Sequence, residues 1–263
     1  MMGRNGVWVA GILALIFSGV YPGEGIAYNE GSRIHFEADF EVLERDITQE
    51  DVQFLGQNFP EETTSFESLR LLGKLSVQVI DPLEIYGLFG GSDLEVSDFG
   101  FSADFGAAYG GGARLILYRE ESREMFYHLF ADYRFLTFKA NDTVRFAPQV
   151  DLNGNGIIEP GEILTDERLK ERIRWAEHVI KFGVMGRQEE FEPYGGIRFS
   201  FVRGKDHLPS QAQELNIKLK QSDIFGLFLG TNYYLSRSER AALFIEGSLF
   251  DQFSLTGGVR VGF

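Results

Sequence analysis

A segment of twelve residues, DLNGNGIIEPGE at positions 151–162, carries oxygen-bearing residues at a regular spacing. Its candidate metal ligands are Asp151, Asn153, Asn155, the main-chain carbonyl of Ile157, Glu159 through a water molecule, and Glu162. Calcium takes about six to eight oxygen ligands from carboxylates, amides, carbonyls and water. Gly156 provides the sharp turn that winds the backbone around such an ion. The segment therefore predicts a calcium site, and calcium is the one cofactor that we expect.

The spacing of these ligands is similar to that of an EF-hand calcium loop. The preceding residues FAPQV do not form an amphipathic pattern, and no second loop of this kind occurs in the sequence to pair with the first. Because few of the ligands are carboxylates, we expect the affinity of extracellular calcium modules, with a dissociation constant of about 10⁻⁴–10⁻³ M. The alternative is a loop with Asn-Gly turns that binds no ion.

Catalytic chemistry has no comparable signature. The chain contains no cysteine, which excludes disulfides and thiol catalysis. Its histidines are His35, His128, His178 and His207. His128 and Asp132 share one face of a predicted strand, but at two positions apart on that face they are too distant for a direct general-base pair. Single polar residues inside strands are usually structural, so we predict no catalytic residues and no enzyme activity.

The composition indicates an all-β protein of one domain. The 263 residues include 31 glycines, 25 phenylalanines and 10 tyrosines, which suit twisted sheets with aromatic belts. The formal net charge is −14. Because the binding of nucleic-acid phosphates needs clustered Lys and Arg, we expect no nucleic-acid partner.

The first 27 residues have the pattern of a secretory signal peptide. Arg4 gives a basic start, residues 6–20 form an apolar run, and the small residues at 25–27 predict cleavage after Ala27. The alternative, a transmembrane anchor, needs roughly 20 apolar residues. This run is shorter, and Pro22 follows it closely. We therefore expect residues 28–263 to form the mature domain.

Alternation of apolar and polar residues predicts strands in the mature domain. Over residues 34–42 apolar residues alternate with His35, Glu37, Asp39 and Glu41, which all lie on one face. A charge on the lipid side of a barrel strand costs about 2–4 kcal/mol at mid-bilayer for Lys or Arg and somewhat less for Asp or Glu, so these residues are expected to face a lumen. The predicted strands are 33–43, 69–80, 83–89, 105–118, 125–139, 172–187, 193–203, 218–235, 241–250 and 253–263.

The last predicted strand, FSLTGGVRVGF at 253–263, alternates strictly and ends on an aromatic residue. This tail resembles the closing strand of bacterial outer-membrane β-barrels, and the mature domain resembles the small, OmpA-like kind. The resemblance implies an all-β fold, a transmembrane antiparallel up-and-down β-barrel of about ten strands, with eight as the alternative and the EF-hand-like loop inserted in an extracellular loop. It also implies location in the bacterial outer membrane, contact with outer-membrane lipid, and recognition of the strand ending in Phe263 by the barrel-assembly machinery. A soluble, lipocalin-like barrel is the alternative, because alternation does not say which face is which.

The inward charges predict a filled lumen. The first and last strands of a closed barrel are neighbours, so Glu37, Asp39 and Glu41 are expected to face Arg260, with Lys74 in reach. A second cluster is expected from Asp132, Arg134, Glu177, Lys181 and Arg198. A barrel of about eight to ten strands has little room beyond its own side chains, so we expect no wide pore.

Three functions are consistent with the sequence. A structural or surface-interaction role is favoured, because no catalytic pattern is visible and the predicted loops are long, although the sequence identifies no extracellular ligand. A small-solute, porin-like channel would conduct ions. A lipid-modifying enzyme would change the mass of a membrane lipid.

Overall fold

The computed structural model describes residues 33–54, 57–96, 101–121, 126–146, 167–209, 214–235 and 240–263. Within these residues no helix is long and apolar enough to span a membrane. The predicted signal peptide at 1–27 and the predicted calcium loop at 151–162 lie outside the described residues, so both stay predictions.

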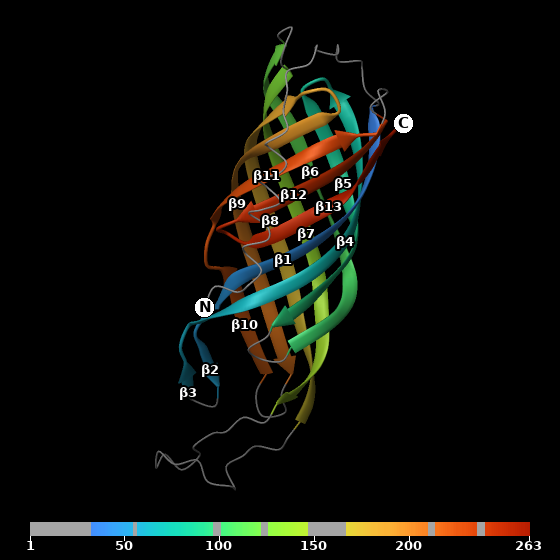
Figure 1. Ribbon diagram of the computed structural model, residues 1–263. Coiled ribbons are helices and arrows are strands. Elements are labelled where there is room, and N and C mark those ends of the chain that lie inside the picture. The colour runs from blue at the N-terminus through green and yellow to red at the C-terminus, as the bar shows by residue number, and fades with distance from the viewer. Residues whose placement is uncertain are drawn as a thin grey trace, which may run out of the picture.

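Eleven antiparallel strands form one sheet that closes on itself (Figure 1). These strands are β1 (Ile34–Gln49), β4 (Glu62–Ile80), β5 (Leu83–Val96), β6 (Phe101–Glu121), β7 (Phe126–Phe146), β8 (Glu167–Arg187), β9 (Phe191–Pro209), β10 (Glu214–Gln221), β11 (Phe225–Tyr234), β12 (Ala241–Leu249) and β13 (Phe253–Gly262). A separate hairpin of β2 (Val52–Phe54) and β3 (Gln57–Phe59) lies between β1 and β4 in the chain. The predicted all-β, up-and-down architecture is confirmed.

The sheet contains two rings of different size. At the end that holds the C-terminus, β1, β4, β5, β6, β7, β8, β9, β11, β12 and β13 close a ring of ten strands. At the opposite end β10 pairs with both β9 and β1, so β1, β4, β5, β6, β7, β8, β9 and β10 close a ring of eight. We call these parts the ten-stranded half and the eight-stranded half. The sheet thus has eleven strands where about ten were predicted, because the segment predicted as one strand over 218–235 forms both β10 and β11.

The change from ten strands to eight occurs where β10 and β11 meet. Both strands pair antiparallel with β9, in nearly the same register, and are separated only by residues 222–224. The sequence predicted one strand over 218–235, and the structure interrupts it there. The physical reason is the end of the β12–β13 hairpin at residues 250–252, beyond which the next strand available to β10 is β1.

Strand length separates the two halves as well. β11, β12 and β13 have 10, 9 and 10 residues, and a tilted membrane strand needs about 9–11. β6, β7 and β8 have 21 residues each. The surplus of roughly ten residues corresponds to about 33 Å of strand at the usual rise. The eight-stranded half therefore extends beyond the part of the barrel that fits a bilayer.

Each strand keeps one face inward and one outward along its length, but the apolar residues change from the outward face to the inward face between the two halves. On β1, Val42 is 51% exposed and the next residue, Leu43, is 3% exposed. On β4, Leu71 is 53% exposed and Leu72 is 5% exposed. Towards the C-terminal end the outward residues are largely apolar, whereas deeper in the eight-stranded half apolar residues such as Ile47 and Phe66 point inward and charged residues such as Glu67 point outward. A soluble barrel's pattern is thus confined to the eight-stranded half.

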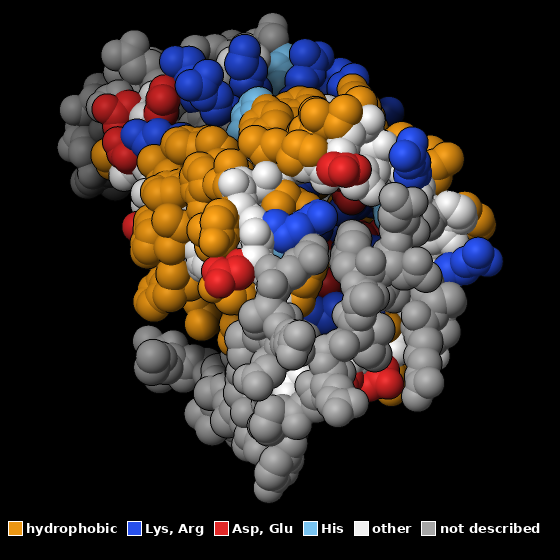
Figure 2. Space-filling view, turned by 90° about the horizontal axis from the view of Figure 1, so that it is seen from above, with side chains coloured by type: hydrophobic (Ala, Val, Ile, Leu, Met, Phe, Trp, Pro, Cys, Tyr) orange, Lys and Arg blue, Asp and Glu red, His pale blue; other side chains and the backbone are white. Residues whose placement is uncertain are grey.

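The ten-stranded half carries an apolar belt on its outer wall. Its exposed members include Phe40, Leu71, Leu75, Val77, Phe89, Tyr109, Leu115, Leu129, Tyr133, Phe182, Val184, Ile197, Phe225, Leu227, Leu243, Val259 and Val261. Viewed from the end where the C-terminus lies, hydrophobic side chains cover much of the outer wall, while Lys, Arg, Asp and Glu side chains are visible inside the ring (Figure 2). Phe263 is exposed, and its N–H donates to the carbonyl of Ile34 at 2.9 Å. The apolar belt on the outer wall is a surface that suits contact with lipid acyl chains.

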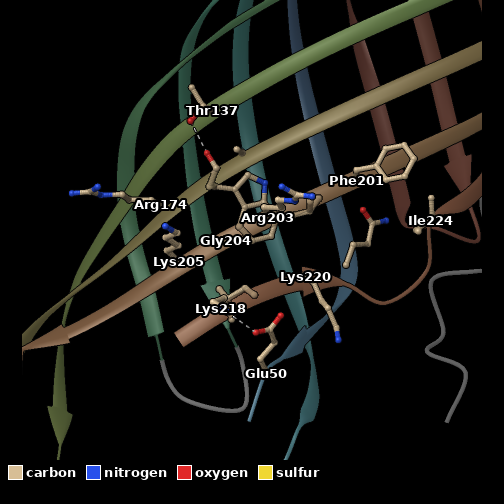
Figure 3. Close-up of a pocket in the computed structure, with 15 residues that line it drawn as sticks. Glu50, Thr137, Arg174, Phe201, Arg203, Gly204, Lys205, Lys218, Lys220 and Ile224 are labelled. Carbon is tan, nitrogen blue, oxygen red and sulfur yellow. Dashed lines mark hydrogen bonds and ion pairs between the residues drawn. The ribbon is translucent and has the colours of Figure 1, made fainter. Parts of the chain in front are cut away.

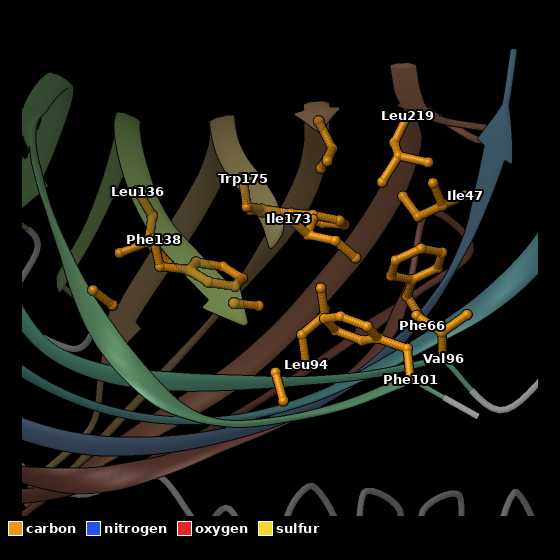
Figure 4. Packing of buried hydrophobic residues seen from close by; sticks show 14 of the residues in the cluster. Ile47, Phe66, Leu94, Val96, Phe101, Leu136, Phe138, Ile173, Trp175 and Leu219 are labelled. Atoms are coloured by element: carbon orange, nitrogen blue, oxygen red, sulfur yellow. The ribbon is translucent and has the colours of Figure 1, made fainter. Parts of the chain in front are cut away.

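The interior of the eight-stranded half is filled by an apolar plug (Figure 4). Its members include Ile47, Phe66, Leu94, Phe101, Leu136, Phe138, Ile173, Trp175 and Leu219. The Trp175 ring lies 5.8 Å from that of Phe66 and 5.9 Å from that of Phe138, measured between centroids. A ring of eight strands has an interior just wide enough for side chains, which explains why these residues meet.

Candidate functional site

Five charged residues form a central network in the lumen: Glu41, Arg45, Arg70, Arg134 and Glu177. Arg70 donates to Glu177 at 2.9 Å and to Glu41 at 3.1 Å. Arg134 donates to Glu177 at 3.0 Å, and Arg45 Nη1 lies 3.4 Å from Glu177 Oε2. Alternation on β1, β4, β7 and β8 turns these residues inward. Buried charges persist when they are paired in this way.

A second group of ion pairs lies in the ten-stranded half. Arg260 donates to Glu37 at 2.7 Å, and Lys74 donates to the same carboxylate at 3.4 Å. Arg114 donates to Asp132 at 2.9 Å. Lys181 also pairs with Glu246, Lys74 Nζ lies 3.9 Å from Glu84 Oε1, and the Tyr86 hydroxyl donates to Asp132 at 2.7 Å. Most of these ion pairs join neighbouring strands along the wall of the lumen. Lys181 on β8 reaches farther, to Glu246 on β12.

The tip of the β12–β13 hairpin is fixed from inside the barrel. Arg198 Nε lies 2.9 Å from Asp251 Oδ2, and Arg198 also donates to Ser248 at 2.9 Å. Ser200 donates to Asp251, and Gln221 donates to the Asp251 carbonyl at 2.9 Å. These contacts join β9 and β10 to the hairpin at the level where the ring changes size.

The predicted charge clusters are confirmed in part. Glu37 meets Arg260 and Lys74, and Arg134 meets Glu177, as expected. Glu41 instead pairs with Arg70 and Arg134. The prediction for the second cluster was wrong for three members, because Asp132, Lys181 and Arg198 pair with Arg114, Glu246 and Asp251. The sequence reasoning missed Arg45 and Arg70, although both have the inward parity of their strands.

The histidines occupy four separate environments. His128 is buried with its ring 4.4 Å from that of Phe126. His178 Nδ1 lies 2.8 Å from the Tyr133 hydroxyl, and His207 Nδ1 lies 3.2 Å from Asn216 Oδ1. His35 is opposite Ser76 in the β1–β4 register. Across the described parts of the chain, no cluster of three or more His, Cys, Asp or Glu residues is placed to hold a metal ion.

A groove of about 760 Å³ opens on the outer wall over β8, β9 and β10 (Figure 3). We call it the basic groove, because five of its lining residues are Arg174, Arg203, Lys205, Lys218 and Lys220. The apolar side chains of Phe201 and Ile224 line it on the side of the apolar belt. The sequence reasoning missed this groove because its cations come from three strands.

The cations of the basic groove stand in register. Arg174 on β8 is opposite Lys205 on β9, and Lys205 is opposite Lys218 on β10. On the other side Arg174 is opposite Lys139 of β7. Side chains in such pairs have their Cβ atoms about 4.5–5.5 Å apart, and like charges there repel. Four neighbouring strands therefore present one row of cations at the same level.

The opposite wall of the eight-stranded half carries a row of negatively charged side chains. Glu44 on β1 is opposite Glu67 on β4, and Glu67 is opposite Glu95 on β5. All three side chains are exposed. The outer surface of this half is therefore acidic on one side and basic on the other, a division that the formal net charge of −14 does not reveal.

Comparison with known proteins bears on the fold. No family model and no curated protein sequence matches the chain. The outer-membrane protease OmpT from Escherichia coli is similar over 90% of this chain and 99% of its own, with a TM-score of 0.51 and 12% identity. The translocator domain of the autotransporter NalP from Neisseria meningitidis covers 98% of this chain and 96% of its own, with a TM-score of 0.47 and 9% identity.

At this identity the likeness to OmpT shows the fold alone. The fold is that of bacterial outer-membrane β-barrels, as the terminal strand predicted, without pointing to the OmpA-like kind in particular. The apolar belt and this fold together support the predicted location in the bacterial outer membrane.

Proposed function

We propose that this chain is a closed outer-membrane barrel with a surface-interaction role rather than a channel. The observation that carries the proposal is the central network, in which Arg70 and Glu177 meet across the lumen at 2.9 Å. A conducting path needs continuous water, and two fillings lie in series here. Along the lumen from the end that holds the C-terminus, the charged network comes first, and the apolar plug around Trp175 follows it in the eight-stranded half.

The orientation of the barrel follows from its connections. At the end that holds the C-terminus, residues 81–82 and 188–190 form short turns, whereas residues 50–61 and 147–166 connect strands at the other end. Barrels of this type have short periplasmic turns and longer extracellular loops. The eight-stranded half then stands on the extracellular side, where its charged outer faces are available to a partner.

The predicted calcium loop fits this orientation. Residues 151–162 lie between β7 and β8 in the chain, and these two strands end and begin, at Phe146 and Glu167, in the eight-stranded half. Calcium bound there would stiffen an exposed connection at the surface that meets a partner. This part of the proposal depends on the sequence motif and not on the geometry of the lumen.

The conductance of single barrels in planar bilayers tests the proposal. We expect the folded wild-type protein to give no stable conductance steps. A variant with a gap in each filling (Arg70→Ala, Glu177→Ala and Trp175→Ala together) is expected to conduct, provided that heat-modifiable gel migration shows it folded. Stable steps from the wild-type protein would contradict a closed lumen and support the small-solute channel instead.

A further inference from the structure

The row of cations in the basic groove is short of negative partners. Among the residues that the structure describes, ion pairs reach Lys218, 3.3 Å from Glu50, and Lys220, 3.3 Å from Glu61. All four of these side chains are exposed, and exposed pairs of this kind are weak. Within the same described residues, Arg174 and Lys205 have no carboxylate at ion-pair distance. The chain keeps like charges opposite each other on neighbouring strands, although this arrangement is unfavourable without a counter-ion.

The place of the groove in the barrel restricts what that counter-ion is. Phe201, 42% exposed, precedes Arg203 by two residues on the same face of β9, and Ile224, which also lines the groove, directly precedes β11. The groove therefore spans the edge of the apolar belt, with apolar side chains towards the membrane and cations towards the eight-stranded half. A ligand that fits must carry an apolar part and an anionic part, separated along the barrel axis.

We propose that the basic groove binds a phosphate-bearing lipid of the surrounding leaflet, with the phosphate on Arg174, Lys205 and Lys218 and an acyl chain along Phe201. Guanidinium and ammonium groups are the usual ligands of phosphate, and Arg binds it through paired N–H donors. Each cation near an anionic membrane surface adds to the attraction. The proposal rests on the barrel orientation proposed above, and it gives the outer surface a partner of stated chemistry, a phosphate-bearing lipid.

Two other occupants of the basic groove are the alternatives to a lipid: a second copy of this chain, and free phosphate. A second copy of this chain could bring its acidic row of Glu44, Glu67 and Glu95 against the cations. Free phosphate could bind the cations without using the apolar side of the groove. The lipid is favoured because it alone uses both the cations and Phe201, and because the groove continues into the apolar belt.

Native mass spectrometry of the mature barrel, extracted in mild detergent, tests the proposal. The probe is dioleoyl phosphatidic acid, and dioleoylglycerol is its counterpart without phosphate. We expect the wild-type protein to bind the first lipid and not the second, and an excess of inorganic phosphate not to displace it. The variant Arg174→Gln/Lys205→Gln is expected to bind about 30-fold more weakly, at about fivefold per cation.

A matched control variant removes the same charge elsewhere. Arg33→Gln/Arg240→Gln changes two exposed cations at the end that holds the C-terminus, and it is expected to bind like wild type. Equal binding of both lipids, displacement by inorganic phosphate, equal losses in both variants, or a bound second copy in place of lipid would each overturn the proposal. The lipid comparison needs no variant, so a misfolded variant does not spoil the test. A conducting lumen would contradict the closed barrel and leave this result unchanged.

Discussion

Arg70 of β4 and Glu177 of β8 meet at 2.9 Å although four steps around the sheet separate their strands. The contact therefore crosses the lumen instead of following the wall. Glu177 also receives Arg45 and Arg134, so one fully buried carboxylate balances three guanidinium groups together with Glu41. Lateral hydrogen bonds hold neighbouring strands together, whereas this network ties opposite walls.

Removal of the Glu177 carboxylate should be costly. Glu177→Ala leaves Arg45, Arg70 and Arg134 with too few negative partners in a buried site, and loss of one member of such a group typically costs about 3–5 kcal/mol of unfolding free energy. Urea unfolding of the barrel in detergent, followed by gel migration, measures the loss. The control Glu67→Ala removes an exposed carboxylate and should stay within about 0.5 kcal/mol of wild type. Similar losses in the two variants would contradict the central role of Glu177.

The fold could be predicted to the extent that strand alternation shows in the sequence. Residues 34–42 and 253–263 alternate strictly, and the structure pairs these segments as the closing contact of the barrel. The eight-stranded half was missed because the alternation changes phase at adjacent apolar residues such as Val42-Leu43 and Phe201-Val202. Beyond those doublets the outward residues are polar, so strands resembled loops.

The contacts between side chains could be predicted less well. Glu37 and Arg260 lie on strands that must be neighbours in any closed barrel, and that pair was predicted. The contact between Arg70 and Glu177 depends on the width of the ring and the stagger of its strands, and the alternation of residues along the sequence does not contain this information. The basic groove depends on the register between β8, β9 and β10, and net charge gave no hint of it because acidic residues outnumber basic ones, 39 to 25.

The predicted calcium loop is tested by isothermal titration of the folded barrel with calcium. We expect one weak site, with a dissociation constant of about 10⁻⁴–10⁻³ M. Asp151→Ala should abolish the heat because it removes the ligand at the first position. Asp142→Ala, an acidic residue of β7 outside the motif, should keep it. Absence of heat from the wild-type protein would favour a loop that binds no ion.

Trp175 reports on the interior of the eight-stranded half. The chain has two tryptophans, and Trp8 lies in the predicted signal peptide, so the mature domain is expected to contain Trp175 alone. Its side chain is 2% exposed within the apolar plug. We expect blue-shifted fluorescence that neither acrylamide in water nor brominated acyl chains in the bilayer quench. A control with Trp175→Phe and Leu71→Trp should be quenched by the brominated lipid. Strong lipid quenching of Trp175 would mean that this face of β8 points outward.

Leu71 and Glu67 offer the sharpest test of where the membrane ends. Both point outward on β4, four residues apart, with Leu71 in the apolar belt and Glu67 in the eight-stranded half. Leu71→Arg should cost up to about 2–4 kcal/mol of unfolding free energy in lipid, with the larger value nearer mid-bilayer. Glu67→Arg should cost nothing measurable, because the new guanidinium lies in water between Glu44 and Glu95, where cross-strand pairs of opposite charge add about 0.2–1 kcal/mol. Urea unfolding in liposomes measures both variants. Because the two substitutions introduce the same side chain on the same face, equal costs would show that the boundary does not lie between these positions, and a larger cost for Glu67→Arg would place the eight-stranded half in the bilayer.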